Sequence, residues 1–169
     1  MFVLGIDPGL SRCGYGLVQR SGSRLTASAG GVVTTEVTAP LPERLHLLFT
    51  ELRSLVAEMR PDAVVVERVF FQTNVRTAMA TGQAGGLALV AAAEAGCEVA
   101  QYTSNEVKQA VVGFGSASKE QVQNMVAALL ELPKRPSPPD VADALALAVC
   151  HLTSQPLRQA IAASTGRQL

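Results

Sequence analysis

The chain has 169 residues, which is an ordinary length for a single domain. Hydrophobic residues make up 48% and charged residues 17%, so the chain can build a sizeable core, which must be mostly Ala, Val and Leu because aromatic residues are only 4%. The 14 basic residues balance the 14 acidic ones, which excludes a uniformly basic surface, so any nucleic-acid-binding face must be a local patch.

The first third of the chain predicts three strands. Residues 2–7 form a short run of mostly Phe, Val, Leu and Ile that is typical of a strand buried on both faces. Pro8 and Gly9 predict a turn, after which residues 14–20 and 25–36 are the second and third strands. Because only short turns join these strands, we expect an antiparallel meander on one side of a sheet.

The rest of the chain alternates helices with two further strands. The expected helices cover residues 41–59, 75–95, 104–112, 119–131 and 140–153, and the strands cover residues 63–67 and 98–102. Apolar residues spaced alternately three and four apart predict the first helix, and a capping box from Ser118 to Gln121 predicts the start of the fourth. Helical crossovers make the later strands parallel to the first. The predicted fold is therefore α/β, with a mixed five-stranded sheet and helices on both faces.

Residues 1–153 are expected to form one domain, and residues 154–169 a flexible tail, because that segment contains Gln, Ser and Arg. The most apolar region, residues 84–95, is too short to cross a bilayer, and the N-terminus lacks the basic segment and cleavage site of a signal peptide. The three cysteines lie far apart without metal-binding spacing, which is typical of reduced thiols. We therefore expect a cytoplasmic protein with no membrane segment.

Four acidic residues lie in unusually apolar surroundings. Asp7 ends the first strand, and Glu67 ends the strand over residues 63–67. Asp140 and Asp143 lie three residues apart in the first turn of the last helix, so they share one face, and the helix dipole favours negative charge there. The carboxyl ends of neighbouring parallel strands meet at one edge of a sheet. The last helix can dock at that edge and complete a cluster of four acids.

Buried carboxylates repel one another and lose hydration, so a cluster of them requires compensating charge. The usual compensating group is a divalent cation, and several carboxylates around Mg²⁺ or Mn²⁺ predict phosphoryl-transfer chemistry, with a two-metal nuclease as the leading interpretation. Three of the acids also have alternative roles: Asp7 suits a turn, Glu67 a strand end at the surface, and Asp140 a helix N-cap. Asp143 has no comparable alternative, because it lies inside the helix on a mostly apolar stretch.

Five segments resemble, in order, the RuvC family of bacterial Holliday junction resolvases. They are GIDPGLSRCGYG, VVVERVFFQTN, GQAGGLALVAAA, SNEVKQAVVGFGSASKEQVQNMV and PDVADALALAVCH. GIDPG alone is also similar to strands of sugar kinases and actin-like ATPases, whereas the complete ordered set is specific. The resemblance extends over residues 2–153, which is nearly the whole chain.

The resemblance implies a ribonuclease-H-like fold and a homodimeric endonuclease of recombination and DNA repair. Such an enzyme resolves four-way junction DNA by paired symmetric nicks in two strands of like polarity. It uses Mg²⁺, for which Mn²⁺ substitutes, with two ions per active site. The family's acids match Asp7, Glu67, Asp140 and Asp143, with Asp140 at a position where some relatives have His. Asp7 would bridge the two ions, Glu67 and Asp140 would each complete one site, and Asp143 would bind an ion directly or support the residues that do. The family also implies a partner, the RuvA–RuvB branch-migration complex.

Two groups of residues are predicted to contact DNA. Phe70 and Phe71 directly follow the acid at position 67, and aromatic side chains beside a nuclease site can stack on unpaired bases. Phe70 matches the family's base-wedging position, while Phe71 fits that role and a place in the core equally well. Lys108 and Lys119 match family lysines near the scissile phosphate, and Arg76 is a further candidate for a phosphate contact.

Small residues have two further predicted roles. Gly113 and Gly115 would let the loop between the third and fourth helices approach DNA closely. Gly82, Gly85 and Gly86 would let another element pack closely against the second helix. That element is either a second copy of the chain in a dimer, which we favour, or the sheet.

Three other functional classes share part of this pattern. An actin-like or sugar-kinase-like ATPase needs two such domains, for which 169 residues leave no room. A junction-binding module without catalysis would be favoured by the loss of a carboxylate, and all four are present. A ribonuclease-H-type nuclease that acts on RNA–DNA hybrids would have the same acids, but the Phe-bearing loop and the lysines of residues 104–121 favour junction DNA. Competition between junction and hybrid substrates distinguishes this last class from a junction resolvase.

Overall fold

The computed structural model describes residues 1–68 and 74–165, which form five strands and five helices. In chain order they are β1 (Phe2–Asp7), β2 (Arg12–Ser21), β3 (Arg24–Thr34), α1 (Leu41–Met59), β4 (Ala63–Glu67), α2 (Val75–Glu94), β5 (Glu98–Tyr102), α3 (Ser104–Val112), α4 (Lys119–Leu129) and α5 (Pro139–Thr165). The predicted order of elements is confirmed, and the capping box at the start of α4 is present.

The five strands form one sheet in the order β3-β2-β1-β4-β5. β1 and β2 pair antiparallel, as do β2 and β3, so the first three strands are the predicted meander. β4 runs parallel to β1, and β5 runs parallel to β4. The predicted α/β fold with a mixed sheet is therefore confirmed.

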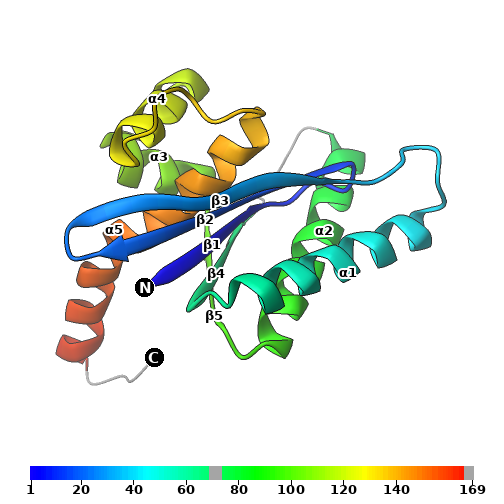
Figure 1. Cartoon of the computed structure of the whole chain (residues 1–169), viewed down its shortest axis with the longest axis horizontal. Coiled ribbons are helices and arrows are strands. Elements are labelled where there is room, and N and C mark those ends of the chain that lie inside the picture. Colours follow the sequence, from blue (N-terminus) through cyan, green and yellow to red (C-terminus); the bar gives the residue numbers. More distant parts are fainter. Residues whose placement is uncertain (69–73, 166–169) are drawn as a thin grey trace.

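Helices cover both faces of the sheet (Figure 1), so the central strands are buried on both sides. Val3 and Val65 face a core that includes side chains of α3, α4 and α5. Leu4 and Val64, their neighbours in sequence, face a second core formed with α1 and α2. This alternation follows from the two-residue period of a strand. It fixes which strand residues can face the functional site.

The helix α5 packs closely against β1 and β2 at the glycines of these strands. A Cβ atom at Gly5 would lie 1.9 Å from the carbonyl oxygen of Ala144, and one at Gly16 would lie 2.7 Å from the side chain of Leu145. A glycine inside a strand often marks such a close approach of another backbone. The glycines therefore determine how closely α5 can lie over the ends of the central strands.

One predicted boundary is wrong by more than two residues. The last helix, expected to end at residue 153, continues as α5 to Thr165. Residues 154–165 include Leu, Gln, Arg and three Ala, and these residues have high helix propensity, so their polarity does not end the helix. Within residues 1–68 and 74–165, none of the helices combines the length and apolar character needed to cross a lipid bilayer.

Candidate active site

Asp7 and Glu67 end two neighbouring parallel strands. The register pairs Ile6 with Val66, which places the two acids next to each other one residue further on. Ile6 and Val66 belong to the core beneath α1 and α2. Because strand side chains alternate, the two carboxylates point to the other face of the sheet, where α5 lies. The two strands are neighbours in the sheet, which is the condition for the two acids to approach each other.

Asp140 and Asp143 lie in the first two turns of α5, which packs over β1, the strand that carries Asp7, and over β2. A Cβ atom at Gly14 would lie 2.3 Å from the carbonyl oxygen of Asp140, so β2 and the start of α5 touch through their backbones. Only glycine allows this contact without displacing the helix. The contact positions the first turn of α5 at the edge where β1 and β4 end.

A pocket of about 380 Å³ opens at this edge. Its lining includes three of the four acids, two lysines and several apolar side chains: Asp7, Glu67, Ser104, Val107, Lys108, Lys119, Val122, Asp143, Ala146 and Leu147. Residues from β1, β4, α3, α4 and α5 therefore meet here. The fourth acid, Asp140, is not part of this lining.

The carboxylates in the pocket lack sufficient positive charge. The pKa of Asp7 is raised from 3.8 to about 7, first by burial and then by the negative charges of Asp143 and Glu67. The pKa of Glu67 is also raised, first by burial and then by the charge of Asp143. Lys119 partly offsets these increases. With a pKa of about 7, Asp7 is partly protonated near neutral pH. A bound cation would balance the negative charge and favour the ionised carboxylate.

Two cationic side chains contact the acids of α5. The Lys119 Nζ atom lies 2.6 Å from Oδ2 of Asp143, and this hydrogen bond raises the pKa of the lysine. The Arg12 guanidinium donates two hydrogen bonds to Oδ2 of Asp140, at 2.8 Å from Nη2 and 3.3 Å from Nε, which hold the pKa of that carboxyl below its usual value. Lys119 was predicted from the sequence as a functional residue, whereas Arg12 was not.

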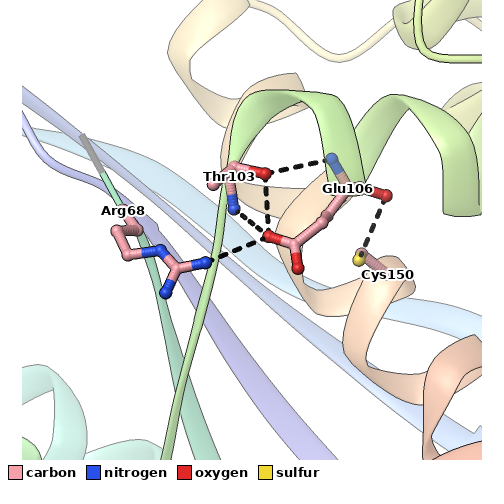
Figure 2. Close-up of polar contacts among 4 residues, drawn as sticks. All are labelled: Arg68, Thr103, Glu106 and Cys150. Carbon is pink, nitrogen blue, oxygen red and sulfur yellow. Dashed lines mark hydrogen bonds and ion pairs between the residues drawn. The ribbon is translucent and has the colours of Figure 1, made fainter. Parts of the chain in front are cut away.

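The start of α3 is anchored beside the end of β4 (Figure 2). Glu106 accepts hydrogen bonds of 2.7 Å from the backbone N–H and the hydroxyl of Thr103, and these bonds lower its pKa. The Arg68 guanidinium lies 3.5 Å from the same carboxylate, and the Cys150 thiol donates to the Glu106 carbonyl oxygen. These contacts join the residue that follows Glu67 to the helix that forms one wall of the pocket.

The four carboxylates are suitable ligands for a hard divalent cation, although they do not converge on one point. Within the described ranges, no three His, Cys, Asp or Glu side chains form a ready-made metal-binding group. Carboxylate oxygens are nevertheless the ligands that Mg²⁺ and Mn²⁺ prefer. The raised pKa of Asp7 marks a cluster that a cation would stabilise.

The predicted DNA contacts fall into three groups. Lys108 and Lys119 line the pocket. Arg76 lies in the first turn of α2, where it is exposed and outside the pocket lining. Phe70 and Phe71 lie outside the residues that the structure describes.

The three glycines of α2 differ in what they face. A Cβ atom at Gly85 would lie 3.7 Å from Pro8 and 3.8 Å from Val66, so this glycine faces the sheet. At Gly82 and Gly86 an added Cβ would meet no other atom within 4 Å. One residue therefore packs against the protein's own core, and two lie on a face that the described part of this chain leaves open.

Comparison with known proteins gives one consistent family. The family model described as crossover junction endodeoxyribonuclease RuvC matches residues 3–151. The RuvC protein of Heliobacterium modesticaldum is 52% identical over 150 residues, which cover 89% of this chain and 93% of the relative. The structure of Thermus thermophilus RuvC has a TM-score of 0.85 and 38% identity, and the match covers 94% of this chain and 97% of that one. The structure of T. thermophilus RuvC in complex with a Holliday junction substrate also has a TM-score of 0.85, with 37% identity and coverage of 93% and 96%.

Proposed function

The chain belongs to the RuvC family of crossover junction endodeoxyribonucleases, and from this premise we propose that it resolves Holliday junctions during recombination and DNA repair. It would nick two strands of like polarity symmetrically, one at each active site of a dimer. The observation that carries this proposal is the pocket that brings together Asp7, Glu67, Asp143, Lys108 and Lys119 from five different elements. Acids to hold metal and lysines to hold phosphate are the groups that phosphodiester hydrolysis requires.

The proposed cofactor is Mg²⁺, with Mn²⁺ as a substitute and two ions per active site. Bound divalent ions supply an activated water and stabilise the leaving oxygen. Asp7, Glu67, Asp140 and Asp143 are the proposed ligands. Asp7 is proposed to contact both ions, as the family resemblance implies, and the charges of all three other acids help to raise its pKa. Glu67 and Asp140 would then complete one site each, and Asp143 would bind directly or hold Lys119 in place.

The lysines are proposed to bind the phosphate that is cut. Lys119 carries a positive charge at neutral pH, and its hydrogen bond to Asp143 raises its pKa further. It is also the first residue of α4, and the N-terminus of a helix favours negative charge. Lys108 lies across the same pocket on α3. The two side chains would position the phosphate against the carboxylate cluster without taking part in proton transfer.

The proposed DNA face extends beyond the pocket through Arg76, Phe70 and Phe71, and through the loop between α3 and α4. Phe114 in this loop is 44% exposed, and it is the one exposed aromatic side chain in the described part of the chain. The loop is held in place because the Gln109 side chain donates a 2.7 Å hydrogen bond to the carbonyl oxygen of Gly113. A fixed loop that exposes an aromatic ring suits stacking on a base.

A homodimer through α2 is the proposed assembly. The outward face of this helix carries Val75 and Met79, which are 70% and 62% exposed, followed by Gly82, Gly86 and the half-exposed Val90. Spacings of three and four residues place them in one stripe. Large apolar side chains next to open glycines form a surface that a second copy of α2 can pack against closely.

The remaining proposals concern the cellular setting. The family implies the RuvA–RuvB branch-migration complex as a partner. The three cysteines are free in the structure, which suits a reducing cytoplasm. Residues 1–153 would form the nuclease domain and residues 154–169 a tail, of which the part up to Thr165 is helical.

The test is cleavage of a synthetic mobile four-way junction in Mg²⁺, in Mn²⁺ and in a chelator, with linear duplex and RNA–DNA hybrid as competitors. We expect paired symmetric nicks that require metal and leave 5′-phosphate and 3′-hydroxyl ends. Linear duplex and RNA–DNA hybrid should compete poorly with the junction. Glu58→Gln, which changes an exposed acid on α1, is the matched control and should cut like the wild type. Equal cutting of duplex or hybrid would indicate a broader nuclease, and binding without cuts in any metal would indicate a recognition protein.

A further inference from the structure

Asp140 is bound by an arginine to which the proposed reaction assigns no role. Arg12 is the first residue of β2, and it lies 128 positions from Asp140 in the sequence. Its Nη2 and Nε atoms reach the same carboxylate oxygen, at 2.8 Å and 3.3 Å. The backbone contact between Gly14 and Asp140 brings the two elements together, so the fold itself places Arg12 beside this acid.

The acid that Arg12 binds is also the one of the four that does not line the pocket. Asp7, Glu67 and Asp143 line the pocket, whereas Asp140 is not part of its lining. The Arg12 side chain is 50% exposed and that of Asp140 is 24% exposed, so the pair lies at the rim of the site and faces solvent. The guanidinium of Arg12 therefore occupies the carboxylate that Asp140 would offer to a metal.

The ion pair is not what attaches α5 to the sheet. Close packing of the helix against Gly5, Gly14 and Gly16 already does so. Ion pairs that face solvent add little stability, because water screens them and both side chains lose freedom. Arg12 can therefore change partner at little cost to the fold.

We propose that Arg12 is an exchangeable counter-ion of the active site. It neutralises Asp140 in the metal-free protein, yields that carboxylate to a divalent cation, and then binds a phosphate of the junction. The proposal rests on the proposed function, which supplies the metal and the DNA. A guanidinium suits both partners, since its planar fork matches carboxylate and phosphate alike.

The exchange couples two binding events. A cation that takes Asp140 releases Arg12 toward DNA, and DNA that takes Arg12 releases Asp140 toward the cation. By linkage each ligand must then strengthen the binding of the other by the same factor. Arg12 is a positioning residue in this scheme, because it acts on metal binding through Asp140.

The first test is calorimetric titration of the DNA-free dimer with Mn²⁺, which requires no cleavage. Arg12→Gln should bind Mn²⁺ about two- to fivefold more tightly than wild type, because it removes a competitor whose ion pair is solvent-exposed. Arg12→Lys should return the affinity toward wild type. Arg24→Gln is the control, because Arg24 forms an exposed ion pair with Glu131 on another part of the molecule. Unchanged or weaker Mn²⁺ binding by Arg12→Gln would overturn the proposal.

The second test is junction binding in Ca²⁺, with a gel that confirms that the DNA stays uncut. Wild type and Arg24→Gln should bind the junction more tightly in Ca²⁺ than in chelator, and Arg12→Gln should lose part of that gain. An equal gain in all three proteins would overturn the transfer of Arg12 to DNA. If the proposed nuclease function failed but Arg12→Gln still bound Mn²⁺ more tightly, the counter-ion role would stand without the reaction.

Discussion

Replacement of Asp7 by Asn should stabilise the metal-free protein at alkaline pH. The folded protein raises the pKa of Asp7 from 3.8 to about 7, chiefly because the carboxyl is buried and secondly because Asp143 and Glu67 are negative. An acid with a raised pKa binds its proton more tightly in the folded state than in the unfolded state. Its contribution is therefore most favourable below pH 3.8 and is lost as the pH rises to about 7.

The size of this effect follows from the two pKa values. A difference from 3.8 to about 7 corresponds to roughly 4 kcal/mol of unfolding free energy. Structural relaxation reduces what is measured, so we expect Asp7→Asn to be more stable than wild type by about 1–3 kcal/mol near pH 8. Asparagine has nearly the same shape and carries no charge, so it removes the repulsion and keeps the packing.

The assay is urea unfolding in chelator between about pH 5 and pH 8. Wild type should lose stability across this range, and Asp7→Asn should lose less, while Glu58→Gln should follow the wild type. Added Mn²⁺ should then stabilise wild type at the alkaline end more than Asp7→Asn, because the metal binds the folded state. The reasoning would be refuted by an Asp7→Asn protein that is no more stable than wild type at alkaline pH.

Three further predictions concern the docking of α5, the DNA face and the dimer. Gly14→Ala should lower the free energy of unfolding by about 1–3 kcal/mol and weaken Mn²⁺ binding, because its Cβ would lie 2.3 Å from the Asp140 carbonyl oxygen; urea unfolding of a variant as stable as wild type would contradict the backbone contact. Phe114→Ala should weaken junction binding by the worth of one stacked base, about 1–3 kcal/mol, with Mn²⁺ binding unchanged, and equal affinity in a binding titration would remove Phe114 from the DNA face. Met79→Asp should convert a dimer to a monomer in analytical ultracentrifugation, because it buries a charge in the α2 interface; a dimer that persists would place the interface elsewhere.

The positions of Asp7 and Glu67 were predictable from the sequence, because each ends a short apolar run and strands joined by helical crossovers run parallel. That reasoning needs only local patterns and the handedness of connections. The end of α5 was not predictable in the same way. A polar composition suggests a flexible segment, but residues 154–165 have the propensity to continue a helix that already packs on the sheet.

Arg12 was not predictable, because its meaning depends on Asp140, which lies 128 residues away. An arginine after a turn has no pattern that distinguishes it from a solvated surface residue. One signal was available: glycines inside a strand, such as Gly5 and Gly14, often mark the close approach of another backbone. They indicate that a helix packs directly on β1 and β2, and from that contact the proximity of Arg12 to the acids of α5 follows.

The measurement that tests the account most directly is single-turnover cleavage of a four-way junction by Asp7→Asn, made alongside a junction-binding titration of the same protein. Cleavage should fall by about a thousandfold or more, because the variant loses the acid that is proposed to contact both metals, while junction affinity should stay within a few-fold of wild type. Cleavage close to the wild-type rate would contradict the carboxylate cluster as the catalytic centre. Loss of binding together with cleavage would show instead that Asp7 maintains the structure.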